Sequence, residues 1–229
     1  MKRCRVLLAL LIVVVFSSFV YARSAGDESL QKLMDGNKRY VSGDLAKKNI
    51  GDDRRKELLK GQKPFAIVVT CSDSRVPPEL LFDQGMGDIF VIRVAGNVVD
   101  QIELGSIEYG AEHLNAPLLI LLGHSNCGAV KATLETKGKA EGNIGAIVKK
   151  IAPAAKAAQK KGGSEEEILE AAIQGNLRNV YKDLMSKSTI IPHLTKEGKL
   201  KIVAGEYSLA TGKVEMIDLP KMAHKEKAH

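Results

Sequence analysis

Three short, uninterrupted apolar runs lie in the middle of the chain, at residues 64–70, 89–92 and 117–122. Runs of this length without alternating polar positions are typical of strands buried on both faces, as in parallel sheets covered by helices. The segments between and after them, 102–114 and 127–136, have helical patterns. This β-α order predicts an α/β fold, with a central, mostly parallel β-sheet flanked by helices in a single domain.

Further patterned segments lie on both sides of this unit. Apolar positions recur at helical spacing over 27–41, which predicts an extended N-terminal helix. Two more helices are expected at 144–161 and 164–186, on either side of a pair of glycines. Segments 200–207 and 214–217 then predict a C-terminal hairpin or edge strand.

The first 22 residues have the layout of a secretory signal. Three basic residues precede an apolar run, and a cleavage site is expected between Ala22 and Arg23. The apolar segment is shorter than the roughly 20 residues of a spanning helix, although an uncleaved anchor is the alternative. We expect a signal peptide at 1–22, one domain at 23–229, and a periplasmic or secreted protein without stable membrane association after cleavage.

The net charge at first suggests a polyanionic partner. The 229 residues include 34 Lys and Arg against 27 Asp and Glu, a formal charge of +7. Three of the basic residues lie in the leader, so the remainder has 31 against 27, or +4. Aromatic residues make up 4% and tryptophan is missing from the sequence, whereas base stacking requires aromatic side chains. With no nucleic-acid-binding motif either, we expect no nucleic-acid partner.

Chemically unusual residues follow the first and third predicted strands. Residues 71–75 are Cys-Ser-Asp-Ser-Arg, and residues 123–128 are Gly-His-Ser-Asn-Cys-Gly. Ligands gather at the carboxyl ends of parallel strands, so we expect the two segments to meet. Two thiolates, one imidazole and one carboxylate suit Zn²⁺, which predicts one zinc ion per chain. The candidate donors are Cys71, Asp73, His124 and Cys127.

The residues leave more than one arrangement open. A disulfide between Cys71 and Cys127 would suit an exported protein, but it leaves the neighbouring polar residues without a role. Four protein ligands would make a closed, structural zinc site, whereas three plus water would make a catalytic one. Arg75 favours the open site, because its guanidinium can hold the Asp73 carboxylate in a bidentate pair away from the metal. Asp73 then remains a fourth ligand only in a closed state.

Taken together, these motifs resemble those of the β-class carbonic anhydrases. The matching strings are C-S-D-S-R-V-P-P-E from position 71, R-V-A-G-N from position 93 and G-H-S-N-C-G-A-V from position 123. The resemblance extends over about residues 30–207 and implies the β-carbonic anhydrase fold. In that family the three zinc ligands and the catalytic Asp-Arg dyad correspond to Cys71, His124, Cys127, Asp73 and Arg75.

The resemblance also implies a substrate pocket and an assembly. Family positions that contact the substrate correspond to Gln62, Phe90, Ala95 and Tyr109. The family's pocket is built across a dimer interface, which implies a homodimer or higher homo-oligomer. Val68 stands where many bacterial members have the tryptophan of an allosteric bicarbonate site, so we expect that site to be missing here.

The expected activity is reversible hydration of carbon dioxide to bicarbonate and a proton, by a zinc-bound hydroxide that the Asp-Arg dyad gates and orients. Two thiolates make the metal less acidic than three histidines would, so activity should rise at alkaline pH. Tyr109 and His113 lie four residues apart and could relay the proton, although His113 also fits a surface residue without a role. Hydrolysis of carbonyl sulfide or carbon disulfide is an alternative activity, and a zinc-dependent binding or structural protein is another.

Overall fold

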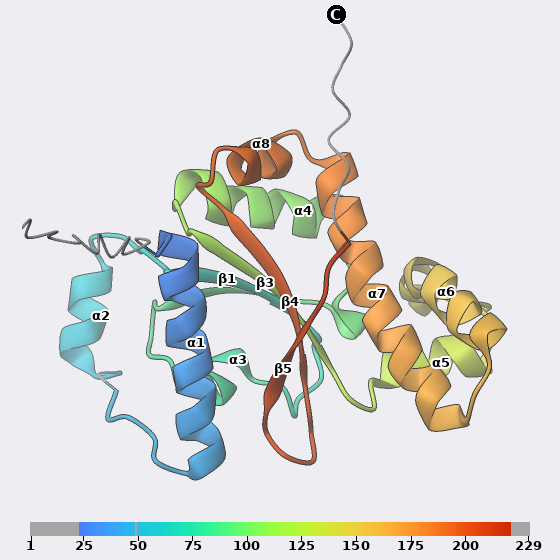
Figure 1. Ribbon diagram of the computed structural model, residues 1–229. Coiled ribbons are helices and arrows are strands. Elements are labelled where there is room, and N and C mark those ends of the chain that lie inside the picture. The colour runs from blue at the N-terminus through green and yellow to red at the C-terminus, as the bar shows by residue number, and fades with distance from the viewer. Residues whose placement is uncertain (1–22, 49, 221–229) are drawn as a thin grey trace, which may run out of the picture.

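The computed structural model describes residues 23–48 and 50–220. The predicted signal peptide at 1–22 lies outside the described residues. A five-stranded sheet in the order β2-β1-β3-β4-β5 forms the centre of the fold (Figure 1). None of the helices in the described part is long and apolar enough to cross a membrane.

The sheet confirms the strands predicted from the apolar runs. The first four strands are mutually parallel, and only β5 pairs in the antiparallel direction, with β4. Every residue of β1 and β3 is buried, whereas the edge strand β2 is mostly half-buried; continuous apolar runs are thus strongest where helices cover both faces. The strands are β1 (Ala66–Thr70), β2 (Ile89–Arg93), β3 (Leu118–His124), β4 (Lys201–Tyr207) and β5 (Val214–Ile217).

Helices cover both faces of this sheet (Figure 1). On one face, side chains of α4, α7 and α8 pack against β1 and β3, and on the other face α1 and α3 do so. Helices α5 and α6 pack beside α7 at the carboxyl end of the parallel strands. The helices are α1 (Ala25–Ser42), α2 (Asp52–Leu58), α3 (Pro78–Leu81), α4 (Gln101–Glu108), α5 (Gly128–Glu135), α6 (Ile144–Lys161), α7 (Glu165–Lys187) and α8 (Ile190–Lys196).

The structure corrects the sequence-based helices in two places. The helix predicted at 102–114 is not continuous: α4 is followed by a π-helical turn, η2 (Tyr109–His113). Helices α2, α3 and α8 were not predicted, because they are short and α2 buries none of its side chains. Without a buried stripe, a helix of seven residues leaves no apolar periodicity in the sequence.

Candidate metal centre

The structure brings the two predicted clusters together at the carboxyl end of the sheet. Cys71 directly follows β1, His124 is the last residue of β3, and Cys127 caps the start of α5. Strands β1 and β3 are parallel neighbours, which explains how residues so distant in sequence meet. One ligand atom from each of these three residues lies within 4.8 Å of the others, and all three residues are buried.

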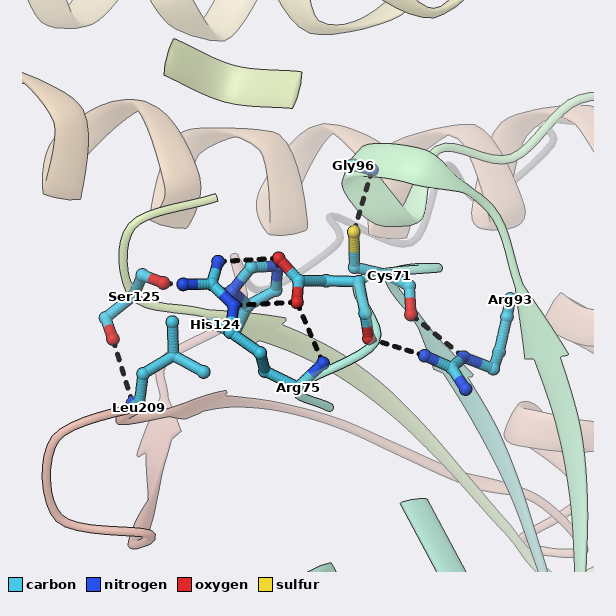
Figure 2. A network of polar contacts seen from close by, with 8 residues as sticks. Cys71, Arg75, Arg93, Gly96, His124, Ser125 and Leu209 are labelled. Carbon is cyan, nitrogen blue, oxygen red and sulfur yellow. Dashed lines mark hydrogen bonds and ion pairs between the residues drawn. The ribbon is translucent and has the colours of Figure 1, made fainter. Parts of the chain in front are cut away.

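The His124 ring is held in one orientation by its neighbour. Its Nδ1 lies 2.9 Å from the carbonyl oxygen of Ser125, so Nδ1 carries the proton and donates it. Ser125 is itself fixed, because its amide donates to Tyr207 O at 3.0 Å. Its Oγ also accepts from the Leu209 amide at 3.0 Å (Figure 2). Among the described residues, Nε2 of His124 is buried without a hydrogen-bond partner. A buried nitrogen lone pair of this kind suits a metal ligand.

The two cysteines are free thiols with very different proton affinities. A hydrogen bond from the Cys127 thiol stabilises the Cys71 thiolate and lowers the pKa of Cys71. The same interaction, together with burial, raises the pKa of Cys127. One negative charge is therefore stabilised by the protein, whereas a second thiolate at this distance requires a cation. Two thiolates and an imidazole are the donors that Zn²⁺ prefers, so the residues fit a zinc ion.

Asp73 lies beside the cluster but is held by Arg75. The Arg75 side chain donates from Nε to Oδ1 at 2.9 Å and from Nη2 to Oδ2 at 2.7 Å, and its backbone amide donates to Oδ1 at 3.0 Å. These bonds keep the pKa of the Asp73 carboxyl well below its usual range. Oδ2 nevertheless lies 3.9 Å from Nε2 of His124. The predicted bidentate pair is confirmed, with the carboxylate at the edge of the donor cluster.

Two further contacts hold Cys71, and sequence reasoning did not assign them. Arg93, at the end of β2, donates from Nε to Cys71 O at 3.0 Å and from Nη2 to Asp73 O at 2.6 Å. The amide of Gly96 donates to Cys71 Sγ at 3.2 Å. Figure 2 shows Gly96 at the Cys71 sulfur and Arg93 at the backbone carbonyl of Cys71. The string R-V-A-G-N was the only sequence signal for them.

The residues expected in the substrate pocket are more scattered. Gln62 is exposed in the connection between α2 and β1, and in the described chain no hydrogen bond or ion pair links it to the cluster. Ala95 is half-buried beside Gly96. Phe90 on β2 lies 6.1 Å from the Tyr109 ring, which is 46% exposed. The Tyr109 and His113 rings lie 5.3 Å apart, so these two residues do meet.

Comparison with known proteins agrees with this geometry. Residues 66–214 match the family model described as carbonic anhydrase. A carbonic anhydrase of Mycolicibacterium smegmatis is 42% identical over 80% of this chain and 89% of its own length. Carbonic anhydrase 2 of Mycobacterium tuberculosis is 38% identical over 81% of this chain and 90% of its own.

Solved structures give the class. The β-carbonic anhydrase CcaA superposes with a TM-score of 0.66 at 26% identity, over 82% of this chain and 95% of that chain. A Coccomyxa β-carbonic anhydrase superposes with a TM-score of 0.65 at 27% identity, over 82% of this chain and 85% of that chain. The family match, the relatives and the shared fold all agree with the buried Cys-His-Cys cluster. The chain therefore belongs to the β-class carbonic anhydrase family.

Proposed function

We propose that this protein catalyses the reversible hydration of carbon dioxide, with one zinc ion held by Cys71, His124 and Cys127. The observation that supports it best is the cluster itself: three buried donors converge, and the His124 Nε2 lone pair has no protein partner among the described residues. A zinc ion bound there would act as a Lewis acid and lower the pKa of a bound water far below that of bulk water.

In this proposal Asp73 is a hydrogen-bond acceptor and not a fourth ligand. Arg75 occupies both of its oxygens from one side, so the carboxylate stays ionised and remains at the edge of the donor cluster. Its remaining lone pairs are free to accept a hydrogen bond from the attacking water. Acceptance of that hydrogen bond would orient the water's lone pair towards carbon dioxide, which is the role we assign to the Asp73–Arg75 dyad.

We further propose that the substrate pocket is completed by a second copy of the chain. Gln62 and Tyr109 are exposed, and Leu59 and Ile102, near them in sequence, are 85% and 81% exposed. Large apolar side chains with this exposure suit an interface. Two copies joined here would bring Gln62, Phe90 and Tyr109 to a shared pocket in which Ala95 forms an apolar wall.

The leader at 1–22 supports the proposal that the enzyme works outside the cytoplasm, in the periplasm or as a secreted protein. N-terminal sequencing of the protein recovered from its native cells would test this. A mature chain beginning at Arg23 is expected, and a chain that retains the leader in a membrane fraction would contradict cleavage.

The activity is tested by stopped-flow hydration of carbon dioxide with protein containing one zinc per chain. We expect turnover that rises towards alkaline pH. Asp73→Asn should lower kcat/KM by about 10²-fold or more while zinc content stays at one per chain, because it removes the acceptor but no ligand. The proposal would be contradicted if protein with full zinc occupancy did not hydrate carbon dioxide between pH 7 and 9. Hydrolysis of carbonyl sulfide without hydration of carbon dioxide would reassign the substrate.

A further inference from the structure

A single glycine amide, that of Gly96, donates a hydrogen bond to the Cys71 sulfur. Gly96 lies in the short turn η1 (Ala95–Asn97) with φ of +68°, a conformation that favours glycine. The turn is closed by the Asn97 amide, which donates to Val94 O at 2.8 Å. A Cβ at position 96 would meet Ile151 Cδ1 at 2.6 Å. Both the positive φ and the close approach of Ile151 therefore favour glycine at this position.

The same glycine is also held by a residue from a distant helix. Asn176 of α7 donates from Nδ2 to Gly96 O at 2.8 Å. Only 1% of Asn176 is exposed, and it lies on the buried face of α7 between Ile173 and Val180. Asn176 and Cys71 thus contact Gly96 through its two backbone polar groups, and α7 is linked to the metal-binding sulfur by two successive hydrogen bonds.

Core stability alone does not explain an asparagine at this place. Within the described residues, Oδ1 of Asn176 is buried without a partner. An unpaired buried acceptor is unfavourable; a leucine of similar size would have none of its own but would leave the Gly96 carbonyl without the Nδ2 donor. The Nδ2 bond to Gly96 is the contact that only the amide provides. This points to a role for Asn176 in placing the Gly96 amide.

We propose that Asn176 is a positioning residue: by fixing Gly96, it sets the hydrogen bond on Cys71 Sγ and thereby limits how much charge the thiolate donates to the bound metal. Hydrogen bonds from amides to metal-bound sulfur withdraw electron density from it, and such contacts tune metal sites. In a site with two thiolates, this withdrawal keeps the metal a stronger Lewis acid. The inference rests on the proposed metal centre.

The hydrogen bond itself is tested without any substitution. In protein loaded with ¹¹³Cd and labelled with ¹⁵N, a bond from Gly96 N–H to metal-bound Cys71 transmits a scalar coupling between cadmium and the Gly96 amide proton. We expect this coupling in the wild-type protein. A fully loaded protein that lacks it would overturn the inference, because the amide would not then reach the bound thiolate.

The role of Asn176 is tested with Asn176→Leu in the cobalt(II)-loaded and zinc-loaded protein. Loss of the Nδ2 donor should weaken the Gly96 bond, shift the thiolate-to-cobalt charge-transfer band to longer wavelength and lower zinc affinity by about 10-fold or more. The matched control is Asn179→Leu, at a half-buried position one turn further along α7. We expect this variant to keep both the wild-type band position and the wild-type zinc affinity. If the leucine variant does not fold, Asn176→Asp, which is nearly the same size and lacks the donor, is measured instead.

The outcomes separate this inference from the metal proposal. If wild-type protein binds neither cobalt nor zinc, the metal centre itself is wrong. If it binds them and the Asn176 variant lowers only the unfolding temperature, leaving the band and the zinc affinity as in wild type, Asn176 is merely structural. A red-shifted band with weakened zinc binding in the Asn176 variant alone supports the positioning role.

Discussion

Two clusters of ionisable side chains lie on neighbouring strands of this sheet, and they differ in what they can bind. The first is the Cys-His-Cys cluster at the ends of β1 and β3. The second surrounds Glu206 on β4, which is in register with Gly123 of β3. Glu206 shares a cavity of about 340 Å³ with Glu170 and Glu215. Both clusters contain buried ionisable side chains, but within the described chain only the first of the two brings three donor atoms within 4.8 Å of one another.

In the second cluster the carboxyl of Glu206 binds a proton, whereas in the first cluster a second thiolate requires a cation. Burial, followed by the neighbouring Glu170, raises the pKa of Glu206 to about 8. Its carboxyl is therefore protonated near neutral pH and has no need of a metal. Around Cys71, by contrast, the hydrogen bond from Cys127 and the Gly96 amide stabilise a thiolate. The candidate metal centre is thus distinguished by converging sulfur and nitrogen donors, one of them ionised, and not merely by the presence of ionisable side chains.

The largest expected effect is that of substituting one of the three proposed metal ligands. His124→Ala should abolish stoichiometric zinc binding and lower kcat/KM by at least about 10³-fold, because the group that acidifies water is lost. Zinc content by atomic absorption and stopped-flow hydration measure the two effects. The matched control is Glu206→Gln in the second cluster, and this variant should bind as much zinc as the wild-type protein. Full zinc content in His124→Ala would show that the ligand set is wrong.

Removal of the metal by a chelator should allow the two cysteines of the first cluster to oxidise. The two sulfur atoms lie within 4.8 Å, so metal-free protein under air should lose the thiols of Cys71 and Cys127 to a disulfide, with oxygen as the oxidant. Thiol titration after denaturation measures the loss. Zinc-loaded protein kept under the same air should retain both thiols, and equal retention in the chelated sample would contradict the prediction.

A smaller change sharpens the role of the dyad. Arg75→Lys keeps the charge but loses the two-pronged contact with both Asp73 oxygens, and should lower kcat/KM by about 10-fold with zinc unchanged. The pH profile should change as well, since Asp73 is then free to approach the metal. Kinetics indistinguishable from wild type would remove the orienting role from Arg75.

The smallest expected effect concerns the second cluster. A carboxyl whose pKa is raised on folding gives the folded state an extra proton between about pH 4.5 and 8, so its contribution to stability is complete below the lower value and is lost as pH rises through 8. Glu206→Gln should therefore stabilise the fold above pH 8 and leave its stability unchanged near pH 4.5. The gain above pH 8 should be only about 1 kcal/mol, because solvent in the cavity screens part of the charge repulsion.

Urea unfolding at pH 4.5 and pH 9 measures this difference. The control is Glu135→Gln, an exposed carboxyl on α5, which should change stability little at either pH. Equal stability of Glu206→Gln and wild type at pH 9 would mean that burial and Glu170 do not raise the pKa of Glu206.

Much of the fold was predictable because burial leaves a direct pattern in the chain. The β1 and β3 runs are apolar at nearly every position, and both strands were predicted to within a few residues. Helix α2 was missed because nothing in it is buried. The π-helical turn at Tyr109–His113 was missed as well, since its apolar spacing resembles that of an ordinary helix.

The sequence by itself determined the donor types, their place after two buried strands, and the Asp-Arg pair, whose members are too close in the chain to be separated. Only the tertiary structure decided that Gly96 contacts Cys71 and that Asn176 contacts Gly96. Asn176 is 105 positions from that cysteine, and on α7 it differs from its neighbours only as a polar residue on a buried face. Hydrogen bonds between distant segments depend on how helices pack against the sheet, and local periodicity carries no record of that packing.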